Sequence, residues 1–310
     1  MKNHRQVLET GFTLVEAVVV IAITGIIAGA VVLFIRAPVA GYVDTARRAE
    51  MTDIADTALR RIGRDLHDAL PNSMRVTNVG SVFFLEFLQV RTGGRYRADA
   101  HAGGTPTTPA CPSNDTRVTD NDILSFYQSP SVGTDTCFKT LGNIPNRAQI
   151  VTTDFVVVYN LGIPGANAYE SPNTNKSLIS ATPSTSGSED QITFAAQTFR
   201  LPSPGNRFDI ITGPVSYVCD PGAQTLRRYS GYTIQAAQPN NAAAAPLSTV
   251  PANNNNLLAS NVSACNFTYN AGAEQRNGLV TLRLSIAEAN SQGQNETVSL
   301  YEAVHVSNVP

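Results

Sequence analysis

An almost uncharged apolar stretch near the start of the chain constrains its fold more than any other feature. Between Phe12 and Ile35 the only ionisable side chain is that of Glu16. At about 1.5 Å of rise per residue, a helix of these 24 residues is roughly 36 Å long, which is enough to cross a bilayer core of about 30 Å. We therefore expect a membrane-spanning helix over residues 12–37, preceded by a short polar segment, 1–11.

The carboxylate of Glu16 is out of place in such a helix. An acidic side chain costs about 2.5–3.5 kcal/mol at the bilayer centre, so one that occurs there is a functional candidate by default. Glu16 lies near one end of the stretch. Its carboxylate could reach the lipid headgroups, or it could pair with a cation of a neighbouring chain.

The order of parts around Glu16 is distinctive. An ordinary secretory signal is cleaved after its apolar region, whereas here the small-residue junction of Gly11-Phe12-Thr13-Leu14-Val15-Glu16 precedes that region. This segment resembles the prepilin signal of type IV pilins and type II secretion pseudopilins. The resemblance implies cleavage between Gly11 and Phe12 by a prepilin peptidase, which removes the leader 1–11, and N-methylation of Phe12. It also implies that Glu16 pairs with the Phe12 ammonium of a neighbouring subunit in a helical filament.

Residues 38–70 predict an amphipathic helix that continues the apolar one. Apolar residues recur at spacings of three and four, as expected of one helix face: Met51, Ala55, Ala58, Ile62, Leu66 and Ala69. Acidic and basic residues three or four apart fill the other faces and add modest support. Pro38 removes one backbone donor, and Pro71 ends the stretch. In the pilin family this half of the helix packs on its own globular domain.

The remaining residues, 71–310, predict an extracytoplasmic antiparallel β domain. The chain as a whole is therefore expected to be α+β, and the resemblance to pilins implies a type IV pilin-like fold. Short alternating runs separated by turn residues indicate strands at 74–79, 82–90, 123–128, 150–159, 191–196, 207–212, 215–219, 225–234, 262–269, 279–287 and 297–306. Polar stretches rich in Gly, Ser, Thr, Asn and Pro predict long loops at 91–122, 160–190 and 236–256.

Four cysteines, all beyond the apolar stretch, suit an oxidising compartment. No pair has the Cys-x-x-Cys spacing of a zinc or redox site. Three pairings are possible. We favour Cys111–Cys137 and Cys219–Cys265, because each closes a local loop and each stabilises by roughly 3–4 kcal/mol in the entropic model.

Catalytic motifs are scarce, so we expect no enzyme activity and no cofactor. The four histidines, His4, His67, His101 and His305, do not form a metal-ligand spacing with one another or with a cysteine. Asp120-Asn121-Asp122 lacks the rest of a calcium loop and is better interpreted as a turn before a strand. A net charge of −2 with 15% charged residues does not suit a nucleic-acid-binding surface.

Later segments resemble a subgroup of the family, the MshO type of minor pilin of the mannose-sensitive haemagglutinin (MSHA) pilus, and more broadly the PulJ/GspJ and PilW types. They include Arg207-Phe208-Asp209-Ile210, the run from Gly213 to Cys219 and the tail from Val304 to Pro310. The resemblance implies a low-copy subunit that initiates the filament or lies at its tip, held first in the inner membrane with its large domain in the periplasm. Its partners would be the major pilin, other minor pilins, the prepilin peptidase and the inner-membrane assembly platform. A J-type pseudopilin of a type II secretion system, and an adhesin at the filament tip or anchored in the membrane, are the alternatives.

Overall fold

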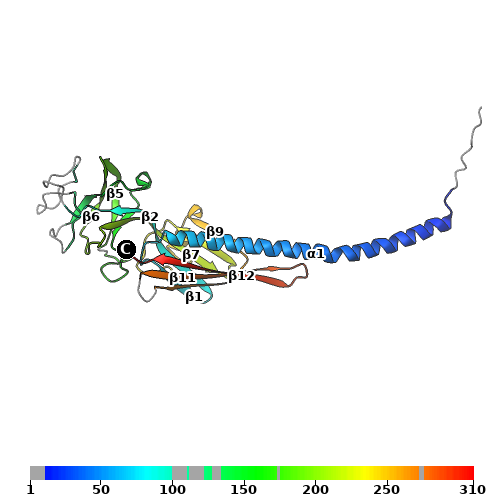
Figure 1. The fold of residues 1–310 in the computed structure, drawn as a ribbon. Helices are drawn as coiled ribbons and strands as arrows, with labels where there is room; N and C mark the ends of the chain where they lie inside the picture. Colours follow the sequence, from blue (N-terminus) through cyan, green and yellow to red (C-terminus); the bar gives the residue numbers. More distant parts are fainter. Residues whose placement is uncertain (1–10, 100–109, 112–121, 128–133, 173–174, 272–275) are drawn as a thin grey trace, which may run out of the picture. The chain divides into compact units, whose positions relative to one another are not determined.

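The computed structural model describes residues 11–99, 110–111, 122–127, 134–172, 175–271 and 276–310 (Figure 1). It contains one long helix, α1 (Leu14–His67), and a mostly antiparallel β region, which confirms the predicted α+β class. The strands are β1 (Arg75–Val79), β2 (Val82–Arg95), β3 (Asp135–Lys139), β4 (Phe155–Val158), β5 (Lys176–Ser186), β6 (Glu189–Gln197), β7 (Arg207–Asp220), β8 (Thr225–Ser230), β9 (Asn255–Ser260), β10 (Val262–Asn270), β11 (Asn277–Ala289) and β12 (Asn295–Ser307). Single 3-10 turns lie at Arg147–Gln149, Leu247–Thr249 and Ala252–Asn254.

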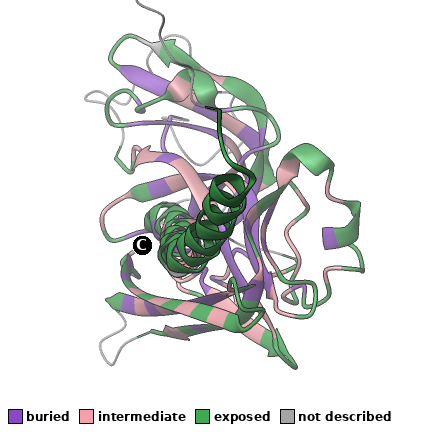
Figure 2. Ribbon diagram, turned by 90° about the vertical axis from the view of Figure 1, so that its right-hand side faces the viewer, coloured by how far each residue is buried: buried purple, intermediate pink, exposed green. Residues whose placement is uncertain are grey.

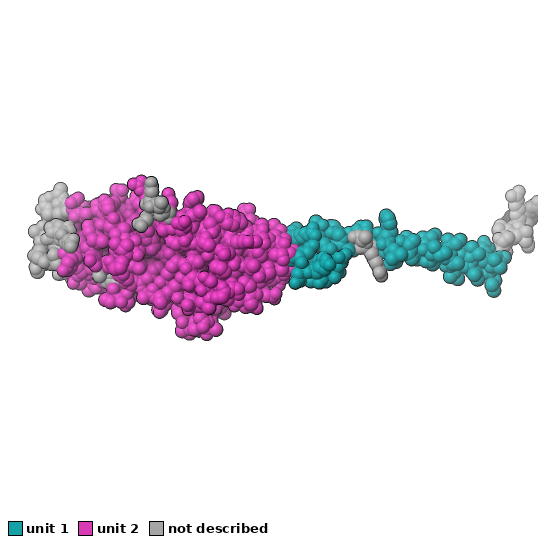
Figure 3. All heavy atoms as spheres, turned by 90° about the horizontal axis from the view of Figure 1, so that it is seen from below, with its two compact units in different colours: residues 1–50, 289–296 teal, residues 51–288, 297–310 magenta. Residues whose placement is uncertain are grey.

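The chain divides into two compact units, which Figure 3 colours separately. Unit 1 comprises Met1–Glu50 and Ala289–Glu296, and so holds the apolar part of α1 and the turn between β11 and β12. Unit 2 comprises Met51–Glu288 and Thr297–Pro310, and holds the amphipathic end of α1 and most of the β region.

Helix α1 continues through Pro38 but ends at His67, three residues before the predicted end at Leu70. The residues that follow turn to pair with β2 instead. The Val90 amide donates to the Asp68 carbonyl at 2.7 Å, and the Leu70 amide donates to the Leu88 carbonyl at 2.8 Å. These backbone bonds replace the ones that a longer helix would make.

Strand β7 organises the larger sheet. Along one edge it pairs with β2, whereas its other edge pairs first with β4 and then with β8. The sheet therefore divides beyond β7, with β4-β5-β6-β3 on one branch and β8-β9 on the other. A second sheet has the order β10-β11-β12. This branching produces separate hydrophobic cores within unit 2.

Two predicted strand boundaries are wrong because glycine and proline lie inside long strands. The run 207–220 is one strand, not two. Pro214 and Gly213 pair in register with Leu88 and Gln89, and the register of the β2–β7 ladder shifts only beyond Gly213, where Thr212 has no partner in the ladder. Strand β2 also continues to Arg95 instead of ending at Val90. It does so through Gly93, where a Cβ atom would lie 2.9 Å from the Phe208 carbonyl oxygen, so only glycine permits the close pairing.

Other corrections fall on the predicted loops. Strand β5 occupies part of 160–190, β9 begins inside 236–256, and β3 was not predicted. Their Ser-, Thr- and Asn-rich sequences resemble loops but pair with neighbouring strands. The predicted strand 123–128 has one isolated bridge, between Phe126 and Phe199, and its last residue lies outside the described part of the chain. Most of the predicted loop 91–122 also lies outside it.

The predicted apolar stripe of the amphipathic helix is confirmed. Met51, Ala55, Ala58, Ile62 and Leu66 are at most 1% exposed and form one core with side chains of β2, β7, β8, β10, β11 and β12. Ala69, beyond the helix, is only partly buried against this core. A second core, rich in phenylalanine, lies among β3, β4, β5, β6 and β7. Figure 2 shows buried and exposed residues alternating along several strands, as expected when one strand face is packed and the other is not.

Candidate functional site

The apolar part of α1 has no packing partner within the described chain. Its large side chains are strongly exposed, for example Leu14 at 80%, Ile21 at 72% and Phe34 at 81%. Figure 2 shows the near end of this helix coloured as exposed all round. Among the described residues, α1 is the one helix long and apolar enough to cross a membrane. So large an exposed apolar surface marks a membrane or protein contact.

The start of α1 has a defined hydrogen-bonded cap. Leu14 is the first helical residue, so Thr13 is the N-cap and Glu16 the third helical residue. The Glu16 amide donates to Thr13 Oγ1 at 3.3 Å, and the Ala17 amide donates to the Thr13 carbonyl at 3.1 Å. Thr-x-x-Glu is the capping-box pattern, a signal in the sequence that would have located the helix start more closely than the apolar run alone.

The helix start at Thr13 separates the predicted cleavage site, which precedes the helix, from Glu16, which lies within it. Gly11 and Phe12 precede the helix and are exposed, so the junction between them is not enclosed by helical hydrogen bonds. Glu16 is also exposed and lies in the first turn, where the helix dipole stabilises a carboxylate. The three predicted residues therefore lie together at one helix end. Among the described residues of α1, ion pairs begin only at Asp44.

Charged side chains of α1 contact the β11–β12 turn within unit 1. Asp44 accepts hydrogen bonds from the Ser291 amide at 3.0 Å and from the Ser291 hydroxyl at 2.9 Å. Arg48 forms a two-point contact with Glu296. The Ser291 donors hold the pKa of Asp44 below its usual value, and the Arg48 guanidinium does the same for the pKa of Glu296. Four side chains thus bind the β11–β12 turn to the helix.

In unit 2 a buried carboxylate joins α1 to the larger sheet. Asp65 is 4% exposed, and its Oδ2 accepts from Tyr217 Oη and from Arg228 Nε, each at 2.7 Å. Arg61, one turn earlier, pairs with Oδ1 at 3.2 Å. Burial is the main influence on Tyr217, whose pKa is raised. Helical spacing alone assigns Asp65 to the polar faces of the helix, and only its long-range contacts reveal its role.

Both preferred disulfides are confirmed. Cys111–Cys137 spans 26 residues and Cys219–Cys265 spans 46, and the described chain contains no free cysteine. The second disulfide joins β7 to β10, and therefore connects the two sheets of unit 2.

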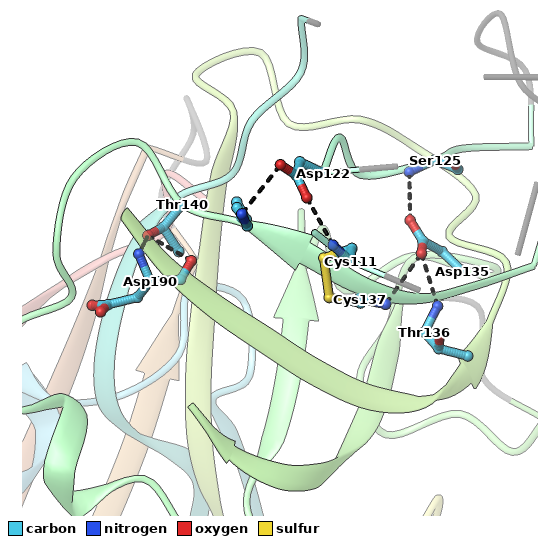
Figure 4. Close-up of a disulfide and its surroundings, with 9 residues drawn as sticks. Cys111, Asp122, Ser125, Asp135, Thr136, Cys137, Thr140 and Asp190 are labelled. Atoms are coloured by element: carbon cyan, nitrogen blue, oxygen red, sulfur yellow. Dashed lines mark hydrogen bonds and ion pairs between the residues drawn. A yellow bond between two sulfur atoms is a disulfide. The ribbon is translucent and has the colours of Figure 1, made fainter. Parts of the chain in front are cut away.

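Figure 4 shows the surroundings of the first disulfide. Asp122 accepts from the Cys111 amide at 2.9 Å and pairs with Lys139 at 3.2 Å, and both charged side chains are fully buried. The neighbouring Asp135 accepts from the Ser125 amide at 3.1 Å. Asp122, considered above for calcium, therefore has a structural role in holding the segment next to Cys137.

The described residues hold no cluster of three or more His, Cys, Asp or Glu side chains that could bind a metal ion. His67 is the last residue of α1, and His305 is an exposed residue of β12. His4 and His101 lie outside the described residues. The histidines that can be located thus belong to separate elements, a helix end and a terminal strand.

Comparison with known proteins adds no family assignment: no family model, no curated protein and no solved structure matches this chain.

Proposed function

We propose that this chain is a minor pilin of an MSHA-type type IV pilus, which a prepilin peptidase processes and which acts in initiation of the filament or at its tip. The observation that carries the proposal is the exposed apolar segment of α1, which begins directly after the Gly11–Phe12 junction and has Glu16 in its first turn. Such a helix fits a bilayer before assembly and a bundle of similar apolar helices from other pilin subunits afterwards.

The proposed role of Glu16 follows from charge balance. Cleavage after Gly11 creates a new ammonium on Phe12, close in sequence to the Glu16 carboxylate. Each charge is costly in an apolar bundle, and pairing between neighbouring subunits offsets that cost. Pairing between subunits also fixes their axial stagger, because each helix contributes one cation and one anion at its end. The large β domain would crowd a repeated lattice, which favours a low copy number.

The first test is processing. In cells that make this protein, we expect the N-terminal peptide of the mature chain to begin at Phe12 and to carry one methyl group, as measured by mass spectrometry. A mature chain that still begins at Met1, or that has lost the apolar segment as well, would contradict the proposal.

The second test is a clean gene deletion scored together for surface pili and for secreted proteins. We expect pili to be lost and secretion to remain normal. Wild-type protein should restore the pili, whereas Glu16→Ala should not. Asp53→Ala is the matched control, because Asp53 is an exposed acid of the same helix outside the apolar segment. Normal pili with exoproteins retained in the periplasm would instead assign the chain to a secretion pseudopilus.

A further inference from the structure

An open pocket of about 660 Å³ lies in unit 2, where β4 and β8 diverge along one edge of β7. Strand β7 pairs with β4 as far as Ile211 and with β8 from Val215 onward. Thr212 and Gly213 lie between these two ladders and border the pocket. The branching of the sheet therefore leaves a hollow beside the strand that joins its branches, and its volume is in the range of small-molecule sites.

The charges of the lining compensate each other. Glu170 and Lys176 are the one acid and the one base among the lining residues that the structure describes. Lys176 is 7% exposed, and its Nζ donates to the Glu170 carbonyl at 3.0 Å, whereas Glu170 Oε2 accepts from the Gly165 amide at 2.8 Å. Burial lowers the pKa of Lys176 to about 8, although the nearby Glu170 carboxylate opposes this shift. Both charged groups are already bound within the protein, so the pocket favours a neutral ligand, which brings no further charge to desolvate.

The floor of the pocket is apolar. Phe155 of β4 and Leu178 of β5 are direct partners in the β4–β5 ladder, so their side chains lie on the same face of the sheet. Leu178 is 41% exposed, which leaves this floor accessible from solvent. An aromatic ring beside an exposed aliphatic side chain suits the C–H face of a flat, saturated ring.

Two tyrosines form a wall that is held in place by buried partners. Tyr169 Oη donates to the Ser73 carbonyl at 2.9 Å, and Tyr232 Oη donates to Glu86 Oε1 at 3.0 Å. Because Ser73 and Glu86 are buried, both hydroxyls are directed into the protein, and the tyrosines present their rings to the pocket. Arg75 pairs with Glu86 at 2.8 Å and fixes its carboxylate. A pocket with such a wall is formed before any ligand arrives.

The rim of the pocket carries short hydroxyl side chains. Thr152, Thr153 and Thr233 are exposed, and Thr212 is half-buried. A hydroxyl can both donate and accept a hydrogen bond, so several of them match a ligand that carries several hydroxyls of its own.

From the neutral lining, the apolar floor and the hydroxyl rim, we propose that the pocket binds a neutral pyranose, with its C–H face against Phe155 and Leu178 and its hydroxyls on the threonines of the rim. The site is contained in unit 2 and does not depend on the assembly role proposed above. It gives the domain a recognition function in addition to that role.

The test is ligand-observed NMR on the purified full-length protein, followed by calorimetry, in a detergent whose headgroup contains no sugar. The probes are methyl β-D-glucopyranoside, methyl β-D-galactopyranoside and methyl β-D-xylopyranoside. We expect saturable binding of at least one of them. 2-Methoxytetrahydropyran, which has the same ring without its hydroxyls, should bind at least 10-fold more weakly. Methyl β-D-glucuronide, which adds a charge, should bind no more tightly than the matching glucoside. Equal binding of 2-methoxytetrahydropyran, or tighter binding of the glucuronide, would overturn the proposal.

Variants of exposed lining residues locate the site without disturbing the core. Thr152→Val combined with Thr153→Val should weaken binding by about 5-fold or more, as expected for the loss of two hydrogen bonds. Thr297→Val changes an exposed threonine of β12 outside the pocket lining and should leave the affinity unchanged. Leu178→Glu places a charge on the floor and should abolish binding, whereas Leu257→Glu, at a similarly exposed position of β9 outside the lining, should not.

Circular dichroism and melting temperature show whether each variant remains folded. Absence of saturable binding by all three pyranosides, or wild-type affinity in either of the two pocket variants, would overturn the proposal.

Discussion

The buried contact between Asp65 and the sheet provides the sharpest test of how α1 is held in unit 2. Replacing Asp65 by alanine removes the acceptor shared by Tyr217 and Arg228, each 2.7 Å from the same oxygen. Tyr217 is fully buried and Arg228 is 8% exposed, so neither regains full hydration. Breaking a buried ion pair by removal of one partner costs about 3–5 kcal/mol, because the other charge remains buried without compensation.

This loss can be measured by thermal unfolding of the full-length protein in detergent with its disulfides intact. In a domain of this size, 1 kcal/mol corresponds to roughly 2–4 °C in melting temperature, so Asp65→Ala should lower it by roughly 6–20 °C. Asp56→Ala is the matched control. Asp56 also pairs with an arginine four residues away on α1, at 2.7 Å, but both of these side chains are exposed. An exposed pair of this kind contributes only about 0.3–0.5 kcal/mol.

A melting temperature for Asp65→Ala within about 2 °C of that for Asp56→Ala would refute the reasoning. A double variant makes the cause specific, since Asp65→Ala combined with Arg228→Met removes the charge that the single change leaves buried. We expect the double variant to be more stable than Asp65→Ala alone, with a coupling energy of about 0.5–3 kcal/mol in a double-mutant cycle. Strict additivity would show that the two side chains do not act together.

Three further predictions concern other contacts. Asp44→Ala removes the acceptor of the Ser291 amide, so exchange of that amide with deuterium should become faster; an unchanged rate would contradict the contact. Replacement of both Cys219 and Cys265 by alanine should lower the free energy of unfolding by roughly 4 kcal/mol. Alkylation of the denatured, unreduced wild-type protein should label no thiol, and labelled thiols would contradict the disulfide pairing. Burial raises the pKa of Asp209 to about 6, so between about pH 4 and 6 the folded state retains a proton that the unfolded chain releases, and the free energy of unfolding falls as the pH rises through this range. Asp209→Asn should remove that fall. A pH profile of the free energy of unfolding that is the same in the variant and the wild type would contradict this prediction.

Local signals in the sequence are sufficient for the helix and for much of the β region. The apolar run after Phe12 and the stripe from Met51 to Leu66 depend only on residue spacing along one helix, and both agree with α1. Alternating strands such as 279–287 also agree closely with β11, because one face of the strand is packed and the other is less so. The Thr-x-x-Glu pattern at Thr13 also predicts the helix start from local sequence, since its hydrogen bond lies within one helical turn.

Local sequence patterns do not predict strand pairing between residues that are distant in the chain. Composition predicts a loop at 160–190, yet part of it is β5, because neighbouring strands supply backbone partners that a polar sequence does not indicate. Gly93 suggests a strand end but instead permits close approach to the Phe208 carbonyl. The pocket beside Lys176 is likewise built from segments distant in the chain.

The sequence alone determined the apolar helix, the amphipathic stripe that continues it and the broad α+β class, because each depends on periodicity within a few turns or one strand. Only the tertiary structure decided that Asp65 is buried against Arg228, that β7 joins two branches of one sheet, and that Lys176 borders an open pocket. The reason is that hydrogen bonding and desolvation depend on which distant residue lies opposite, and no local pattern encodes that partner.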